Sequence, residues 1–134
     1  MKRLTALFIA LMAASMLYSQ TPESFQYQAI VRDNSGNILS NTEIAFRISI
    51  LQGSTSGSSV YTEEHTVTTN DYGLVNLEIG NGSQVSGSFS SISWGDNTYF
   101  LRVELDESGG SDYSEMGTSQ LLSVPYALHA KSVT

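Results

Sequence analysis

The 134-residue chain contains no cysteine, and it has only two prolines and one tryptophan. The absence of cysteine excludes disulfide frameworks, thiolate catalysis, cysteinyl zinc sites and lipid attachment through an N-terminal cysteine. Basic residues are also scarce, because six lysines and arginines stand against 13 aspartates and glutamates, for a formal charge of -7. Since an acidic surface repels phosphate groups, we expect no binding to nucleic acid.

Residues 1–19 have the pattern of a secretory signal peptide. Lys2 and Arg3 give a positive start, and an apolar run follows from Leu4 to Leu17. Small and polar residues then return, so cleavage is expected after Ser19, which leaves Gln20 as the first mature residue. The run is too short and too interrupted by polar residues to span a bilayer. We therefore expect a secreted or cell-surface protein with no stable membrane span after signal removal.

Apolar and polar residues alternate along several segments of the mature chain, as they do in half-buried strands. This alternation predicts strands at 24–32, 44–51, 75–79 and 99–106. Val60–Thr69 is rich in β-branched residues and predicts a further strand, with Glu63, Glu64 and His65 favouring an edge position. A last strand is predicted at Gln120–Val124.

The segments between these strands contain the residues that favour turns and loops. Turns or loops are predicted at Asp33–Asn37, Gly53–Ser59, Asn70–Gly73, Gly80–Gly82, Gln84–Asn97 and from Asp106 through Glu115. We expect Gly80–Gly82 to be a hairpin turn. Phe89, Ile92 and Trp94 are expected to cover the end of the core, since large apolar side chains in a polar loop usually fold inward.

Six or seven short strands with frequent turns predict an all-β fold, an antiparallel two-sheet sandwich of immunoglobulin-like or transthyretin-like kind. The paired cysteines of a strict immunoglobulin domain are absent. We expect the sandwich to span 20–124, followed at 125–134 by a short C-terminal helical segment or a linker to a following region. Pro125 suits the first turn of such a helix.

No pattern of residues points to catalysis. His65 and His129 are the only histidines, and neither has a nucleophile or metal-ligand motif around it. We therefore expect the protein not to be an enzyme, and we assign no catalytic, cofactor-binding or metal-binding residue.

The acidic loop contains Asp106, Glu107, Asp112 and Glu115. Carboxylate oxygens are ligands that Ca²⁺ prefers, but the spacing matches no EF-hand. A solvated acidic loop is the favoured interpretation, and calcium is not expected to be required.

Three ordered segments resemble a module of Bacteroidetes-type secreted proteins. The segments are Phe25–Asp33, Thr68–Gly80 and Gln120–Lys131, and the intervening Ser93–Gly95 and Tyr99–Asp106 are also similar to it. The resemblance covers essentially the whole mature chain. It implies an extracellular or surface sandwich, without catalytic residues, that follows the signal peptide as the head of longer proteins with collagen-like, coiled-coil or tail-fibre-like parts.

These observations lead us to expect a non-enzymatic exported structural or interaction module, the head of a surface or extracellular fibre or adhesin-like protein, with an unknown protein or glycan partner. The alternative is a carbohydrate-binding or calcium-dependent ligand-binding module, which would need Tyr61, Tyr72, Trp94 or Tyr113 exposed on one face. Similar proteins usually continue past the position of Thr134, so either the chain is part of a longer protein or the head is used alone. Oligomerisation is expected only through regions beyond Thr134.

The signal peptide can be tested by mass spectrometry of the protein recovered outside the cell. The mature N-terminus should be Gln20, unmodified or cyclised to pyroglutamate, because the signal is removed during export. Leu11→Arg places a charge inside the apolar run and should abolish export. An exported protein that retains Met1 would contradict the prediction.

Overall fold

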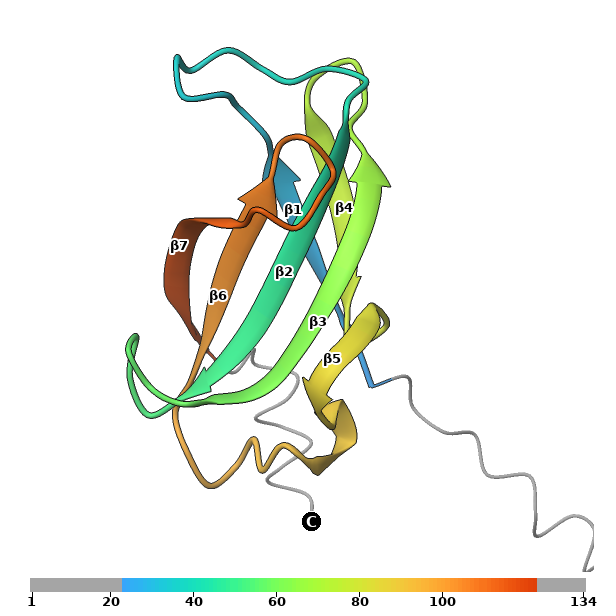
Figure 1. The fold of residues 1–134 in the computed structure, drawn as a ribbon. Coiled ribbons are helices and arrows are strands. Elements are labelled where there is room, and N and C mark those ends of the chain that lie inside the picture. The colour runs from blue at the N-terminus through green and yellow to red at the C-terminus, as the bar shows by residue number, and fades with distance from the viewer. Residues whose placement is uncertain (1–22, 123–134) are drawn as a thin grey trace, which may run out of the picture.

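The computed structural model describes residues 23–122, which form two antiparallel β-sheets (Figure 1). The small sheet pairs β1 (Phe25–Ile30) with β4 (Leu74–Ile79). The large sheet has the strand order β5-β3-β2-β6-β7. Its strands are β2 (Glu43–Gln52), β3 (Ser59–Thr68), β5 (Ser83–Gly87), β6 (Tyr99–Asp106) and β7 (Ser114–Leu121). The predicted all-β, two-sheet antiparallel fold is confirmed.

The core lies between the sheets, and most of it comes from the inward-facing rows of β2, β6 and β4. β2 contributes Ile44, Phe46, Ile48 and Ile50, β6 contributes Tyr99, Leu101, Val103 and Leu105, and β4 contributes Val75, Leu77 and Ile79. All of these side chains are buried. Because successive residues of a strand point to opposite faces, the alternation in the sequence sets this register. The expectation that the apolar rows of β4 and β6 share one core is confirmed.

The prediction that the third strand lies at an edge is wrong. β3 pairs with β2 on one side and, from Tyr61 to Glu64, with β5 on the other. The charged residues suggested an edge, but Glu63 lies on the inner face and is fully buried. Its burial is compensated by hydrogen bonds, which the sequence pattern does not reveal.

Two strands occupy segments that were predicted to be loops. β5 takes the start of the predicted loop Gln84–Asn97, and β7 begins at Ser114, well before the predicted strand Gln120–Val124. These are the two edge strands of the large sheet, and most of their side chains are exposed. Alternation marks a strand only where one face is buried, so neither strand produced the signal.

The segment Gly80–Gly82 is also not the predicted hairpin turn. It follows β4 of the small sheet and leads into β5 of the large sheet, so it carries the chain across the sandwich. The predicted signal peptide 1–19 and the predicted C-terminal helix at 125–134 lie outside the described residues. Within 23–122, no helix has the length and apolar character needed to cross a membrane.

The strand directions place both ends of the described chain at the same end of the sandwich, which we call the base. β1 begins there, and β7 ends there with Leu121 opposite Tyr99 (Figure 1). The opposite end, which we call the apex, carries segment 31–42, the turn Asn70–Gly73 and the loop between β6 and β7.

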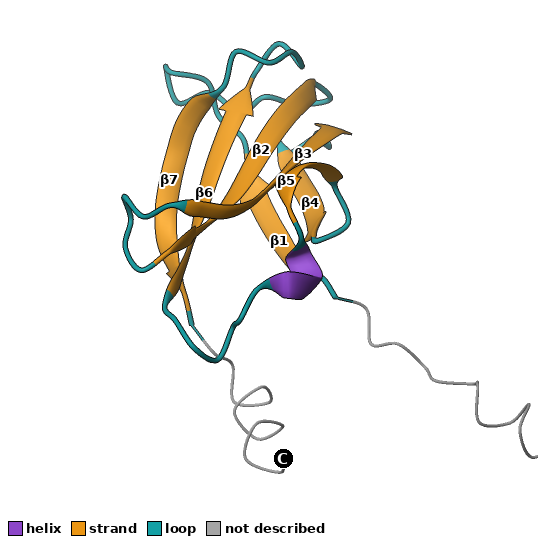
Figure 2. Cartoon of the chain, turned by 60° about the horizontal axis from the view of Figure 1, so that its bottom comes forward, coloured by secondary structure: helices purple, strands orange, loops and turns teal. Residues whose placement is uncertain are grey.

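Aromatic side chains close the base of the core. A single turn of 3₁₀ helix, η1 (Phe89–Ser91), lies at this end (Figure 2). The Phe89 ring is 5.4 Å from that of Tyr61, and the Trp94 ring meets the Tyr99 ring edge-on at 5.2 Å, both measured between ring centroids. Trp94 therefore covers the core, as expected, although 42% of the residue stays exposed.

Truncation of one core residue tests the register. Leu101→Ala should lower the free energy of unfolding by about 2 to 4 kcal/mol, because it leaves a cavity among well-packed side chains. Denaturant titration measures the loss. Val85→Ala, on the exposed strand β5, is the matched control and should change stability by less than about 0.5 kcal/mol. Equal effects of the two substitutions would mean that the assigned register is wrong.

Candidate functional site

Glu63 of β3 holds the segment that crosses between the sheets. Its side chain is fully buried on the inner face of the large sheet. The backbone N–H of Gly80 donates to Glu63 Oε1 at 2.8 Å, and that of Gly82 donates to Oε2 at 2.6 Å. The Tyr61 hydroxyl also donates to Oε2, at 3.2 Å, and His65 Nε2 lies 3.4 Å from Oε1. Both carboxylate oxygens are thus engaged.

The crossing segment comes so close to this carboxylate that it requires glycine. At Gly82, a Cβ atom would lie 2.5 Å from Glu63 Oε2 and 2.6 Å from His65 Nε2. Gly80 has a φ of +110°, and a Cβ there would lie 2.4 Å from the carbonyl oxygen of Glu23. Neither position has room for a side chain, so the two glycines and Glu63 form one structural unit.

The surroundings of Glu63 favour its charged form. Burial by itself raises the pKa of a carboxyl group, because it penalises the charged state. The interaction with His65 and the N–H groups of Gly80 and Gly82 outweigh burial, and the pKa of Glu63 is lowered from its ordinary value. An ionised carboxylate whose oxygens are both occupied by the backbone is suited to a structural role rather than to proton transfer.

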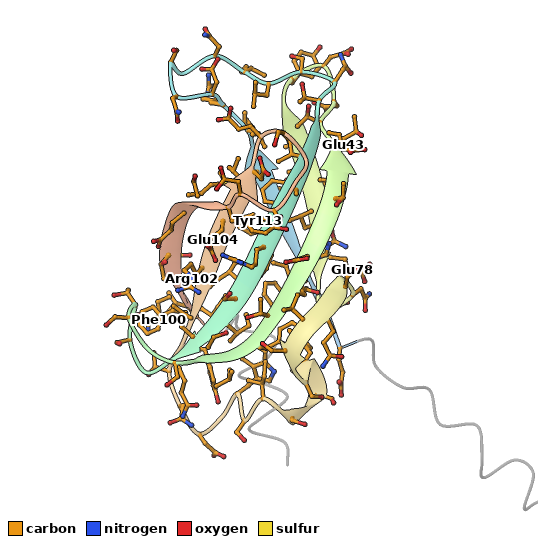
Figure 3. All side chains as sticks on the ribbon, viewed as in Figure 1. Glu43, Glu78, Phe100, Arg102, Glu104 and Tyr113 are labelled. Atoms are coloured by element: carbon orange, nitrogen blue, oxygen red, sulfur yellow. The ribbon has the colours of Figure 1, made fainter. Side chains whose placement is uncertain are left out.

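A second polar cluster lies on the outer face of the large sheet (Figure 3). Arg47 of β2 donates to both oxygens of Glu104 on β6, at 2.8 and 3.2 Å, and Arg102 Nε lies 3.4 Å from Glu104 Oε1. The Tyr113 ring covers Arg47, with 4.5 Å between the guanidinium carbon and the ring centroid. The hydrogen bonds from Arg47 lower the pKa of Glu104. The cluster therefore fixes the β6–β7 loop onto β2.

The acidic loop does not bring its four carboxylates together. Asp106 accepts hydrogen bonds from the backbone N–H and hydroxyl of Ser108 and from the N–H of Asp112. Glu115 accepts instead from the Thr118 hydroxyl. Between residues 23 and 122, no group of three or more histidine, aspartate or glutamate side chains could hold a metal ion. Asp106 shapes the loop through these bonds.

The four aromatic residues considered for carbohydrate binding lie in different places. Tyr61 is buried in the core, and Trp94 covers the base. Tyr113 lies on the outer face of the large sheet, and Tyr72 lies at the apex. These four residues therefore form no shared aromatic platform.

An open pocket of about 310 Å³ lies beside the crossing segment and is lined partly by Tyr61. Its lining includes no histidine, lysine or arginine.

The apex carries an apolar patch that the sequence analysis did not single out. It consists of Ile30, Ile38, Tyr72 and Leu74, which we call the apical patch. Ile30 and Leu74 are direct partners in the small sheet, and a Cβ on Gly73 would lie 2.5 Å from Ile38 Cγ2. Exposure is 51% for Ile30, 41% for Ile38 and 75% for Tyr72. A signal was present, because Ile30 is apolar at a position where the alternation of β1 calls for a polar residue.

Comparison with known proteins identifies the family but not its activity. The profile of a family described as a domain of unknown function (DUF8740) matches residues 26–119. Because this match covers most of the chain, the protein belongs to that family. Neither the curated proteins nor the solved structures give a match.

The role of Glu63 can be tested with Glu63→Gln. The substitution places an amide N–H₂ where a carboxylate oxygen accepted a hydrogen bond, so we expect a loss of about 2 to 3 kcal/mol at neutral pH. Denaturant titration measures it. Glu43→Gln, at an exposed position, is the control and should change stability by less than about 0.5 kcal/mol.

The same pair of proteins gives a pH test. Because the folded-state pKa of Glu63 is lowered, its stabilisation is present above the ordinary carboxyl pKa of about 4.3 and is lost as the pH falls through the folded-state value. The difference in stability between wild type and Glu63→Gln should therefore shrink on acidification. A difference that does not change with pH would contradict the assignment.

Proposed function

We propose that the protein is a non-enzymatic exported module of structural or interaction type that forms the head of a surface or extracellular fibre or adhesin-like protein. The observation that carries this proposal is that β1 begins and β7 ends at the base, while the apex is free of both (Figure 1). A head held at its base presents the opposite loops outward. This is the geometry that a displayed binding module needs.

The sequence supports the location. The expected signal peptide at 1–19 would direct export, and the Bacteroidetes-type head module that the chain resembles directly follows such a signal. An acidic, cysteine-free domain needs no oxidising compartment to fold and resists non-specific association through its net charge. The family assignment is compatible with this role but does not favour it over other roles.

The polar clusters favour a non-enzymatic role. Glu63 and Glu104 are held by backbone N–H groups or by arginine, and Asp106 is held within its own loop. In each case the hydrogen bonds of the carboxylate account for its position by a structural role. The carbohydrate-binding alternative is less favoured, because Tyr61 is buried and the exposed aromatics lie on separate surfaces.

Two epitope-tagged chains test export and orientation together. One tag is inserted at the apex between Asn34 and Ser35, and the other at the base between Thr55 and Ser56, in loops whose side chains are exposed. On intact cells, antibody should label the apex tag at least as strongly as the base tag, because a head held at its base faces outward. Antibody labelling before and after lysis is the measurement.

A chain that also carries Leu11→Arg is the control and should be labelled only after lysis. Labelling of both tags only after lysis would contradict display at the cell surface. Labelling of the base tag alone on intact cells would contradict the orientation of the head.

A further inference from the structure

We propose that the apical patch is a docking surface for a protein partner whose contact surface has apolar side chains surrounded by lysine or arginine. This inference rests on the proposed function, in which the apex faces outward. It goes beyond that function because it assigns the residues that bind and the chemistry of the partner.

The first argument is the concentration of exposed apolar surface. In residues 23–122, seven large hydrophobic residues are exposed, and Ile30, Ile38 and Tyr72 are three of them. The other four, Val85, Trp94, Met116 and Leu122, belong to β5, the base loop and the β7 region. Scattered exposed hydrophobic residues are ordinary, whereas several that gather around one point mark an interaction surface.

The second argument is that the patch is held in a fixed shape. The N–H of Val31 donates to the carbonyl of Gly73 at 2.8 Å, which ties the end of β1 to the turn before β4. Asn70 Oδ1 accepts from the N–H groups of Tyr72 at 2.9 Å and of Leu74 at 3.0 Å. A surface that is ordered before binding loses less conformational entropy when a partner arrives. Tyr72 offers an aromatic side chain on this ordered backbone, and tyrosine is a residue type that often dominates binding energy.

The third argument is charge. All 13 acidic residues of the chain lie between Glu23 and Glu115, and that interval contains three arginines. Two of these, Arg47 and Arg102, lie against Glu104 on the outer face of the large sheet, and the third, Arg32, lies at the apex as the bridge partner of Ile38. At the apex Asp33, Glu43 and Asp71 outnumber Arg32, and Asp71 directly precedes Tyr72. The surroundings of the patch therefore complement a basic partner and repel a second copy of this chain.

The fourth argument favours a protein over a glycan. Three of the four side chains are aliphatic, and only Tyr72 could stack on a sugar ring. Contact with the isoleucines would strip water from sugar hydroxyls without offering them hydrogen bonds, which is unfavourable. Aliphatic and aromatic side chains of a protein would instead be buried favourably on the same surface.

The test uses the purified protein and a phage-displayed library of random short peptides as the probe. The selected peptides should combine lysine or arginine with leucine, isoleucine or aromatic residues. Their affinity, measured by calorimetry with synthetic peptides, should fall about tenfold or more for Tyr72→Ser, as at a binding hot spot. Asp71→Asn should weaken binding less and reduce its dependence on salt.

Val85→Ser is the matched control, since Val85 is also an exposed hydrophobic residue, 56% exposed, and lies on β5 away from the apex. It should leave the affinity unchanged. Because Tyr72 is mostly exposed, Tyr72→Ser should keep the melting temperature of the wild type. Amide chemical shifts of the wild-type protein provide a readout that needs no substitution, and peptide addition should shift residues around Gly73.

The proposal is overturned if no peptide of this composition is selected, or if the selected peptides bind Tyr72→Ser as well as wild type. Tyr72-dependent binding to a glycan array, without peptide binding, would assign the patch to sugars instead. Peptide selection uses purified protein and does not depend on where the cell places the chain. A failure of export labelling and a failure of this test are therefore distinguishable.

Discussion

The burial of one carboxylate, Glu63, fixes how the two sheets are joined. The chain leaves the small sheet at Ile79 and enters the large sheet at Ser83, so the backbone N–H groups between them have no strand to pair with. Glu63 accepts hydrogen bonds from two of these groups, which compensates the cost of burying its charge. Because the carboxylate belongs to β3, it ties the end of the small sheet to the middle of the large one.

The two ends of the sandwich are held together by different kinds of contact. The crossing segment, η1 and the aromatic contacts of Phe89 and Trp94 all lie at the base, where packing is continuous with the core. At the apex the connections are held by backbone and asparagine hydrogen bonds instead, and apolar side chains remain exposed. The base is thus closed by aromatic packing, whereas the connections at the apex keep apolar side chains exposed.

The sequence predicts the half-buried strands well and the other strands poorly. β1, β2, β4 and β6 follow from alternation, because one face of each meets the core. β7 was misplaced because its side chains are mostly exposed, so pairing with β6 rather than burial determines it. The edge assignment of β3 failed for the opposite reason. From the sequence alone, Glu63 is expected to be a solvated charge. It can face inward because the N–H groups of Gly80 and Gly82, far away in the sequence, donate hydrogen bonds to it.

The apical patch shows the same limit at a candidate site. Ile30, Ile38 and Tyr72 come from three segments, and each by itself is an unremarkable exposed residue. In the sequence, Ile30 stands out only as an exception to the alternation of β1. The structure shows that this isoleucine belongs to an apolar surface, because Leu74 pairs with it and Ile38 lies over Gly73. Gly73 is buried beneath this contact, with a φ of +75°, so a side chain there would displace Ile38. The same turn that starts β4 therefore also sets the shape of the exposed surface, so the start of β4 and the proposed docking surface depend on one glycine.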